Sequence, residues 1–333
     1  MRNFPGKIAV MGGGSWATSL SKIVMCSQPA INWYMRRPDR IEDFKVMKHN
    51  PAYMSSITFD TSRINFYADI NQAIDDSDTL IFVTPSPYLK EHLKKVTASL
   101  QHKYIISAIK GLVPDVNMPI SDYFTKYFDV HPDHIILIAG ACHAEEIAME
   151  HLSYLTIVCR DIKKAERLSE TVFHTPYLNS SCSRDMAGLE YVSALKNIYA
   201  IVAGICSGLK YGDNFQAVYI PNAFDEMIRF LNAVHPVKRN ITSAAYLSDL
   251  LVTSYSTFSR NRMFGKMIGE GNSVQVAKVE LGMVAEGYYA TKCIHEINES
   301  HKVDMPILNA LYAVLYERKS PAEQIKMITR KFK

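Results

Sequence analysis

Short strand-like runs alternate with helical stretches in the first half of this chain. The strand-like runs, rich in β-branched and other apolar residues, are Lys7–Met11, Ile31–Met35, Ile64–Tyr67, Thr79–Val83, Tyr104–Ala108, Ile135–Ala139 and Tyr154–Cys159. Helical spacing recurs between most of them, as in Ser15–Ser27, Tyr88–Leu100 and Ile162–Phe173. Apolar strands separated by helices predict βαβ units around a parallel sheet. We therefore expect an α/β fold with a doubly wound, Rossmann-type parallel sheet.

The pattern changes near Asp185, beyond which helical periodicity dominates. One apolar stripe, with steps of three, four and seven residues, consists of Leu189, Val192, Tyr199 and Ala203. Such spacing is typical of one face of a helix. The segment Ser273–Asn298 is also helical in pattern. We therefore predict a sheet domain at residues 1–187 and an all-helical domain at residues 188–333.

Charge gives little reason to expect a nucleic-acid partner. The chain has 37 Lys and Arg against 33 Asp and Glu, a net charge of +4 over 333 residues. Six basic residues and one acidic residue lie in Arg318–Lys333, so the excess belongs to the tail. A charge run of this kind is usually the solvated face of a terminal helix.

Composition and cysteine spacing indicate a cytoplasmic protein. The six cysteines are scattered without a CxxC pair, which suits reduced thiols better than disulfides or a zinc site. No uninterrupted apolar run approaches the length of a membrane span. The first strand-like run begins at Lys7, which leaves no room for a signal peptide.

A glycine-rich turn follows the first strand. Gly12-Gly13-Gly14-Ser15-Trp16-Ala17 has the pattern G-x-G-x-x-A. Gly12 permits the tight turn, Gly14 lets the backbone approach a pyrophosphate, and Ala17 is small enough for the helix to pack on the sheet. The helix that opens at Ser15 offers free N–H groups to phosphates. A glycine-rich turn alone is a weak signal, but this one opens a helix inside a βαβ unit, which predicts dinucleotide binding.

The end of the second strand bears on which dinucleotide binds. Enzymes that use NAD usually place Asp or Glu there to hold the ribose 2′-hydroxyl, whereas this strand ends in Met35-Arg36-Arg37. Guanidinium groups match a 2′-phosphate in charge and geometry. The alternative is that both arginines merely face solvent. We favour NADP(H), with NAD(H) tolerated.

Two lysines occupy unusual positions. Lys110 follows a central strand, at the edge where ligands bind in such sheets. Lys196 lies on the apolar stripe of the first helix of the helical half. A lysine there usually extends its ammonium outward to water. If it cannot, burial lowers its pKa toward the range of a general acid or base.

Polar groups also gather later in the chain. Asp249 and Thr253 precede Ser259-Arg260-Asn261-Arg262, whose donors suit a phosphate, although a helix cap followed by surface arginines explains the same run. Glu286 stands where helical pattern resumes after Val284, and an ordinary exposed glutamate is its alternative. No complete set of metal ligands is present, and Cys142 lacks a positioned base, so we expect neither a metal site nor a cysteine nucleophile.

Taken together, these segments resemble the NAD(P)-dependent glycerol-3-phosphate dehydrogenases of the bacterial type. The matching segments are Gly12–Ala17, Asn50–Tyr53, Ala108–Gly111, Gly140 with Ala144–Glu146, Ala194–Asn197, Ala203–Ile205, Gly208–Asn214, Ser259–Arg262, Ala285–Gly287 and Met305–Ile307. They run nearly end to end. The resemblance implies hydride transfer between glycerol 3-phosphate and dihydroxyacetone phosphate, and a supply of glycerol 3-phosphate for phospholipid synthesis.

The resemblance also implies roles for individual residues. Lys196 would exchange a proton with the substrate C2 oxygen, with Lys110 and Asp249 tuning it. The residues implied to hold substrate are Lys110, Gly140, Cys142, Lys196, Asn197, Asp249, Thr253, Ser259, Arg260 and Asn261. Those implied to line the cofactor are Gly12, Gly14, Ser15, Trp16, Arg36, Arg37, Tyr53, Lys110, Ala144, Arg260, Val284 and Glu286. The expected partner is this small substrate, without nucleic acid or a membrane span, and the helical half could support a homodimer.

One departure and two rivals remain open. The family often has Gly-Pro-Ser-Phe-Ala where this chain reads Gly140-Ala141-Cys142-His143-Ala144, which puts the serine's contact in doubt at Cys142. A 3-hydroxyacid dehydrogenase shares the fold plan and the lysine–asparagine pair, but needs a carboxylate site at Ser259–Asn261. A catalytically silent dinucleotide sensor would not need Lys110, Lys196 and Asp249 together.

Overall fold

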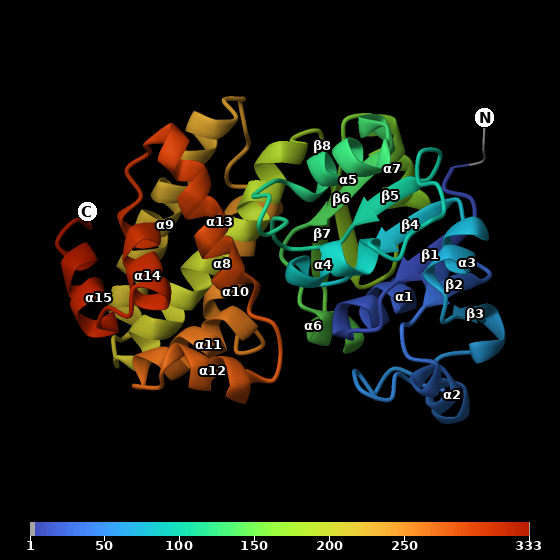
Figure 1. Cartoon of the computed structure of the whole chain (residues 1–333), viewed down its shortest axis with the longest axis horizontal. Helices are drawn as coiled ribbons and strands as arrows, with labels where there is room; N and C mark the ends of the chain where they lie inside the picture. The colour runs from blue at the N-terminus through green and yellow to red at the C-terminus, as the bar shows by residue number, and fades with distance from the viewer. Residues whose placement is uncertain (1–3, 333) are drawn as a thin grey trace. The chain divides into compact units, whose positions relative to one another are not determined.

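The computed structural model describes residues 4–332 and divides them into two compact units (Figure 1). The first unit contains the residues up to Ile109 together with Ile120–Met186. The second contains Lys110–Pro119 together with the residues from Ala187 onward. The sequence-based boundary at residue 187 thus differs from this division mainly in the segment Lys110–Pro119. That segment belongs with the helices, because it accepts a hydrogen bond from Asn197 and donates one to Glu296.

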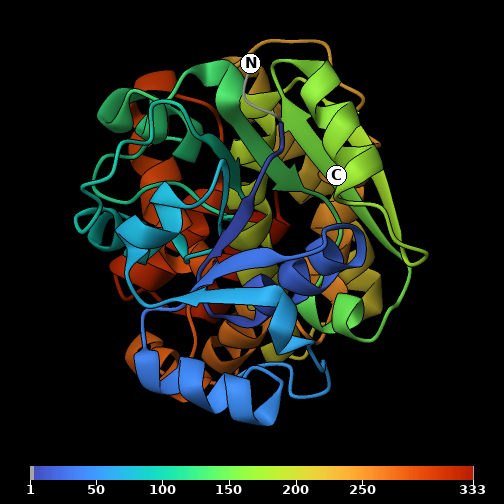
Figure 2. The ribbon, with the colours of Figure 1, turned by 90° about the vertical axis from the view of Figure 1, so that its right-hand side faces the viewer.

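The first unit is built on one eight-stranded sheet, whose twist is visible in Figure 2. The strands are β1 (Ile8–Met11), β2 (Ile31–Tyr34), β3 (Ile64–Tyr67), β4 (Thr79–Phe82), β5 (Tyr104–Ser107), β6 (Ile135–Ala139), β7 (Ser153–Cys159) and β8 (Leu178–Ser183). Their order is β3-β2-β1-β4-β5-β6-β7-β8. Strands from β3 through β6 pair in parallel, which confirms the predicted Rossmann-type sheet.

Helices accompany these strands, as the sequence predicted. They are α1 (Ser15–Ser27), α2 (Pro38–Met47), α3 (Ile70–Asp75), α4 (Ser86–Leu93), α5 (Ile120–Phe128), α6 (Ala144–Ala148) and α7 (Ile162–Thr171), with 3-10 turns η1 (Thr61–Arg63) and η2 (Pro132–His134). β1, β2 and β4 are buried along their whole length, as expected for central strands covered on both faces.

Two features of the sheet differ from the prediction. β7 runs antiparallel to β6, and β8, which pairs in parallel with β7, has no counterpart among the predicted strands. The sequence of β8, Leu-Asn-Ser-Ser-Cys-Ser, is mostly polar because this strand lies at the edge of the sheet and buries only part of its surface. Apolar runs therefore identify central strands better than edge strands.

Helix α4 ends at Leu93 instead of continuing to Leu100. The Asn71 side-chain oxygen accepts hydrogen bonds from the backbone N–H groups of Thr97 and Ala98, at 2.7 and 3.0 Å. These groups are then unavailable to a longer helix. The early end is thus set by a residue distant in sequence, which helical spacing cannot reveal.

The second unit is helical apart from its 110–119 segment and connecting loops. Its elements are α8 (Met186–Gly208), α9 (Asp213–Val234), a π-helical turn η3 (Ala244–Ser248), α10 (Asp249–Tyr255), α11 (Arg260–Gly269), α12 (Val274–Leu281), α13 (Glu286–His301), α14 (Pro306–Tyr316) and α15 (Pro321–Thr329). The predicted stripe of α8, from Leu189 to Ala203, is fully buried. α8 is long and apolar enough to cross a membrane, but 94% of that stretch is buried as the core helix of its unit.

The predicted helix Ser273–Asn298 is divided in two. α12 ends at Leu281, and Gly282 follows in the left-handed conformation with φ +61°. Glycine adopts this conformation without the steric cost that other residues carry. The interruption places Val284 in the connecting loop and Glu286 at the first residue of α13.

Candidate active site

The turn after β1 leaves its backbone N–H groups open to a ligand. Gly12 has φ +144°, and Gly14 caps α1 with no other heavy atom within 4 Å of where a Cβ would stand. The buried Trp33 donates its Nε1–H to the Gly12 carbonyl at 2.7 Å. The buried Asn50 donates to the Gly13 carbonyl at 3.1 Å. With these carbonyls held by the protein, the turn has the form that a pyrophosphate requires.

Ser15 and Trp16 form the first turn of α1, which contains no acidic residue. A negative side chain there would compete with an anionic ligand for the positive end of the helix dipole. The Thr18 hydroxyl donates to the Gly14 carbonyl and accepts from Asn50 Nδ2 at 2.8 Å. Asn50 thus braces both the turn and the helix start, and exposed Tyr53 lies three residues further on.

The two arginines after β2 differ in their surroundings. Arg37 caps α2 and forms an ion pair with Asp39, whose pKa the hydrogen bond from Arg37 lowers. Arg36 is exposed and has no hydrogen bond or ion pair to another described side chain. The pKa of His92 is lowered mainly by burial and to a smaller extent by the nearby charge of Arg36. Arg36 is therefore the guanidinium left available for a 2′-phosphate.

The segment after β6 has its own backbone constraint. Gly140 has φ +109°, and a Cβ there would lie 2.7 Å from the Tyr154 carbonyl oxygen, so no other residue fits. Cys142 is buried and directs its Sγ toward the Gly140 carbonyl at 3.5 Å. Ala144 begins α6, and its carbonyl accepts from the Ser19 hydroxyl of α1 at 2.8 Å. The sheet unit thus links this segment to the helix that follows the glycine-rich turn.

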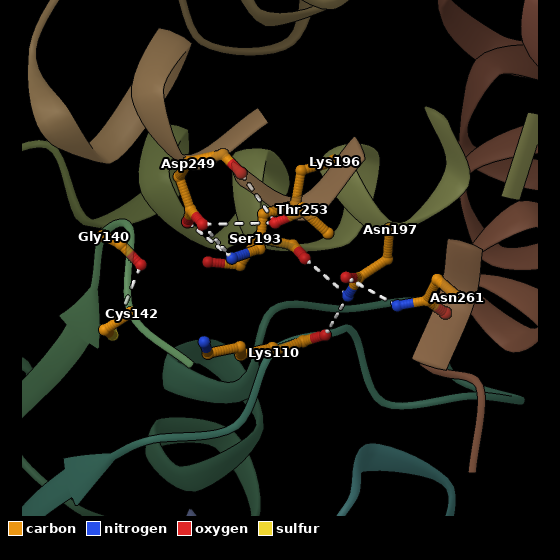
Figure 3. Close-up of polar contacts among 9 residues, drawn as sticks. All are labelled: Lys110, Gly140, Cys142, Ser193, Lys196, Asn197, Asp249, Thr253 and Asn261. Atoms are coloured by element: carbon orange, nitrogen blue, oxygen red, sulfur yellow. Dashed lines mark hydrogen bonds and ion pairs between the residues drawn. The ribbon is translucent and has the colours of Figure 1, made fainter. Parts of the chain in front are cut away.

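The helical unit contains a buried ion pair (Figure 3). Lys196 Nζ lies 2.5 Å from each carboxylate oxygen of Asp249, and these residues are only 2% and 1% exposed. The Thr253 hydroxyl donates to the Asp249 carbonyl at 2.6 Å and lies 3.4 Å from Asp249 Oδ1. The lysine is therefore neutralised inside the protein and does not extend into solvent. Buried charges are tolerated when paired in this way.

A chain of amide hydrogen bonds lies beside this pair (Figure 3). Asn197 Nδ2 donates to the Lys110 carbonyl and the Ser193 carbonyl, both at 2.9 Å. Asn261 Nδ2 donates to Asn197 Oδ1 at 2.9 Å. The Gly287 N–H donates to Asn261 Oδ1, also at 2.9 Å. Three helices and the 110–119 segment are connected through these contacts.

Glycines bring the same helices close enough for these contacts. α8 and α11 run side by side, since Asn197 faces Asn261 and Ile201 faces Gly265 one turn later. A Cβ on Gly265 would stand 1.9 Å from the Ile201 carbonyl oxygen. A Cβ on Gly287 would stand 2.5 Å from the Asn197 carbonyl oxygen. Only glycine allows such backbone approach.

The Ser259–Arg262 run starts α11, and its binding of a phosphate stays a prediction. The Ser259 side chain caps α11 by accepting the Arg262 N–H at 3.3 Å, as the capping alternative predicted. Asn261 is buried in the amide chain, and Arg260 is half-buried at the helix start. Glu286 is also half-buried, which does not fit the alternative of an ordinary exposed glutamate.

Each unit thus collects its own share of the predicted residues. The sheet unit holds Gly12, Gly14, Ser15, Trp16, Arg36, Arg37, Tyr53, Gly140, Cys142 and Ala144. The helical unit holds Lys110, Lys196, Asn197, Asp249, Thr253, Ser259, Arg260, Asn261, Val284 and Glu286. Among residues 4–332, no group of three or more His, Cys, Asp or Glu side chains is placed to hold a metal ion.

Comparison with known proteins agrees with this arrangement. Residues 7–165 match the N-terminal model of NAD-dependent glycerol-3-phosphate dehydrogenase, and residues 185–326 match its C-terminal model. The chain belongs to this family. The sequence is 30% identical over 328 residues to the NAD(P)+-dependent glycerol-3-phosphate dehydrogenase of Chlorobium limicola, covering 97% of both chains. It is 31% identical over 321 residues to that of Streptococcus pyogenes, covering 96% of this chain and 94% of the other.

Solved structures show the same fold over the whole length. The glycerol-3-phosphate dehydrogenase of Coxiella burnetii superimposes with a TM-score of 0.89 at 25% identity, covering 98% of this chain and 99% of the other. That of Saccharomyces cerevisiae gives 0.81 at 24% identity, covering 97% and 99%. The predicted family and Rossmann-type fold are therefore confirmed.

Sequence reasoning missed two residues that shape the site of this glycerol-3-phosphate dehydrogenase family member. Asn50 was noted only within a matching segment, yet it holds the glycine-rich turn. Gly287 was noted in the same way, yet it supplies the N–H that orients Asn261. Asn50 stands directly before Pro51, but Gly13 and Thr18, which accept from its side-chain N–H groups, lie more than thirty residues away.

Proposed function

We propose that this chain interconverts sn-glycerol 3-phosphate and dihydroxyacetone phosphate by hydride transfer, with NADP(H) preferred and NAD(H) accepted. The single observation that carries the proposal is the buried Lys196–Asp249 pair in a member of this family. A buried ammonium held by one carboxylate suits proton transfer to an oxygen whose charge changes during reaction.

The residues of the sheet unit fit a dinucleotide. The open space beside Gly14 and the positive φ of Gly12 provide a cradle that a side chain would fill. The first turn of α1 provides N–H groups for the pyrophosphate, and Arg36 provides a free guanidinium for a 2′-phosphate. When bound, the nicotinamide supplies or accepts the hydride.

The protein's own part in the reaction is proton transfer and positioning. In the reductive direction Lys196 gives a proton to the C2 oxygen of dihydroxyacetone phosphate, and in the oxidative direction it takes that proton back. Asp249 fixes the ammonium in place, and the Thr253 hydroxyl, 3.4 Å from Asp249 Oδ1, helps to hold that carboxylate. Asn197 and Thr253 support the reacting end and Lys110 contacts the substrate, as the family resemblance implies.

The enzyme binds its substrate mainly through the substrate's phosphate group. Arg260 provides charge, and the Ser259 hydroxyl retains its proton for donation while its oxygen caps α11. Binding energy from the phosphate serves to orient the carbon that reacts. From the sheet unit, Gly140 and Cys142 are proposed to contribute further contacts to substrate, and Ala144 to contribute contacts to cofactor.

The wider context follows from the same assignment. We propose a cytoplasmic enzyme that supplies glycerol 3-phosphate for phospholipid synthesis and that forms a homodimer. Domains at residues 1–187 and 188–333 correspond to the cofactor and substrate parts, with Lys110–Pro119 joining the second. Sedimentation of the purified chain at several concentrations tests the dimer, since a monomer throughout would contradict it.

The deciding experiment is a substrate panel. NADPH and NADH oxidation is followed with dihydroxyacetone phosphate and, separately, with 3-oxoacids. The proposal expects turnover of dihydroxyacetone phosphate with a lower KM for NADPH than for NADH. Turnover of 3-oxoacids alone would assign the chain to the rival dehydrogenases. Tight NADPH binding without any turnover would indicate a silent dinucleotide sensor.

A further inference from the structure

The segment Lys110–Pro119 forms a compact excursion from the end of β5. Val113 and Met118 pair as an antiparallel bridge, with the Val113 N–H donating to the Met118 carbonyl at 3.0 Å. The turn between them contains Asp115 and Asn117, with φ of +67° and +49°. Asp and Asn tolerate this left-handed conformation better than most residues. The excursion is therefore closed by its own backbone.

Helical residues hold this excursion at two places. At its base, the Lys110 carbonyl accepts from Asn197 of α8. At its tip, Asn117 Nδ2 donates to Glu296 Oε2 of α13. Asp115 also lies near α13. Burial raises the pKa of Cys293 most, the charge of Glu296 raises it further, and the charge of Asp115 comes third. Cys293 and Glu296 are three residues apart and so share one face of the helix.

Both attachments lead back to the same helix. Glu296 belongs to α13 directly, and the amide chain from Asn197 through Asn261 ends at the Gly287 N–H of α13. Glu296 lies nine positions after Gly287, which corresponds to about 13 Å of α-helix. α13 thus sets the separation between the base and the tip of the excursion. A rigid helix fixes such a separation more firmly than loop contacts do.

We infer that Glu296 and Asn117 are positioning residues for Lys110. Their contact holds the excursion against α13, and this fixes the Lys110 backbone from which its side chain extends. The inference rests on the proposed function, in which Lys110 contacts the substrate. Neither residue touches substrate in this scheme, because both act through the segment that carries Lys110.

The test compares Glu296→Ala, Glu296→Gln and Asn117→Gly in the full chain. Alanine removes the acceptor, glutamine retains one, and glycine removes the donor while still adopting φ +49°. The control is Lys292→Met, because Lys292 Nζ lies 3.8 Å from Glu296 Oε1, one turn away on the same helix, and its removal leaves the Asn117–Glu296 hydrogen bond with both partners. The readouts are hydrogen exchange of amides 111–118 and the steady-state constants for dihydroxyacetone phosphate.

We expect Glu296→Ala and Asn117→Gly to speed exchange of these amides and to raise KM for dihydroxyacetone phosphate about fivefold. This is the size expected for a charge-assisted hydrogen bond partly open to water. Glu296→Gln should restore most of the KM, and Lys292→Met should leave it unchanged. A purely structural role would lower kcat through loss of folded enzyme at constant KM.

Two results would overturn the inference. The first is unchanged hydrogen exchange in Glu296→Ala and Asn117→Gly. The second is faster exchange with an unchanged KM in an enzyme whose wild type is active. If the wild-type chain did not turn over dihydroxyacetone phosphate, the proposed function would fail. The exchange measurement would still decide whether Glu296 holds the excursion.

Discussion

At the scale of single residues, the chemical role proposed for Lys196 is combined with a structural one in its buried ion pair. We expect Lys196→Ala to keep NADPH binding and to lower kcat by about 10²-fold or more, as for loss of a general acid. The same substitution leaves Asp249 buried without a counter-charge, which costs roughly 3–5 kcal/mol of unfolding free energy. Stopped-flow kinetics, NADPH titration and denaturant unfolding measure the three effects.

A double variant separates the chemistry from the stability. Lys196→Met with Asp249→Asn removes both charges and keeps similar side-chain volumes. It should recover much of the lost stability, because replacing a buried ion pair by neutral groups is often near neutral. Activity should remain as low as in Lys196→Ala. A double variant that regained near wild-type kcat would contradict the role of Lys196 in proton transfer.

Arg36 and Arg37 offer a second comparison between neighbouring residues. Since Asp39 engages Arg37 and leaves Arg36 free, Arg36→Ala should weaken NADPH binding by roughly tenfold or more, the size for a charge-assisted hydrogen bond. NADH binding should change little. Arg37→Ala is the matched control and should have a smaller effect. Equal losses for both cofactors would show that Arg36 does not contact the 2′-phosphate.

At the scale of elements, glycines hold α8 against α11. Gly265→Ala would place a Cβ 1.9 Å from the Ile201 carbonyl oxygen, so the helices must separate. Because Asn197 and Asn261 meet one turn before this point, the amide chain would lengthen. We expect a loss of about 1–3 kcal/mol of unfolding free energy, as for an overpacked core, together with a lower kcat/KM. Gly212→Ala, where no atom lies within 4 Å, should change neither.

Glu226 of α9 links another pair of helices. Its buried carboxylate accepts the backbone N–H groups of Ile307 and Leu308, at 2.8 and 3.0 Å, and so caps α14. Burial raises the pKa of Glu226 to about 7, partly opposed by these N–H groups. The folded state therefore favours the protonated carboxyl of Glu226. The contribution of this carboxyl to the free energy of unfolding is complete below the unfolded-state pKa of 4.5 and is lost as the pH rises through 7.

This gives a pH-dependent prediction. Between about pH 5 and pH 8, wild type should lose up to about 3 kcal/mol of unfolding free energy relative to Glu226→Gln, at roughly 1.4 kcal/mol per pKa unit. Glutamine has no titrating group but retains one acceptor for the α14 N–H groups. Denaturant unfolding of both proteins across this range measures the difference. Parallel pH profiles would show that Glu226 has an ordinary pKa.

At the scale of the whole molecule, the basic C-terminal tail is also part of the core. The predicted terminal helix is α15, with Lys326 and Arg330 exposed and with Ile325 and Ile328 buried. We expect Ile325→Ala to cost about 2–5 kcal/mol of unfolding free energy, as for other buried isoleucines. Lys326→Gln with Arg330→Gln should leave thermal stability and activity unchanged. A large effect of the charge variant would contradict a solvated basic face.

The sequence alone predicted most of the sheet because periodicity is a local property. Each parallel strand from β1 to β6 coincides with a predicted apolar run to within one residue at either end. The sequence did not predict the edge strand β8, because a strand that buries little surface lacks a run of apolar residues. The sequence also did not predict where α4 ends or that the chain is interrupted before α13. The first is set by the distant Asn71, and the second by the left-handed Gly282.

The sequence by itself determined the glycine-rich turn, the family and the polar residues of the candidate site, because these are properties of residue type and spacing. Tertiary structure decided which of them act together. It buried Lys196 against Asp249 and attached Lys110–Pro119 to the helices. Each of these depends on contacts between residues whose partners no local pattern specifies. A lysine on an apolar stripe can either extend to solvent or be buried, and the sequence does not decide between the two. Here helix α10 packs against Lys196 and supplies the carboxylate of Asp249.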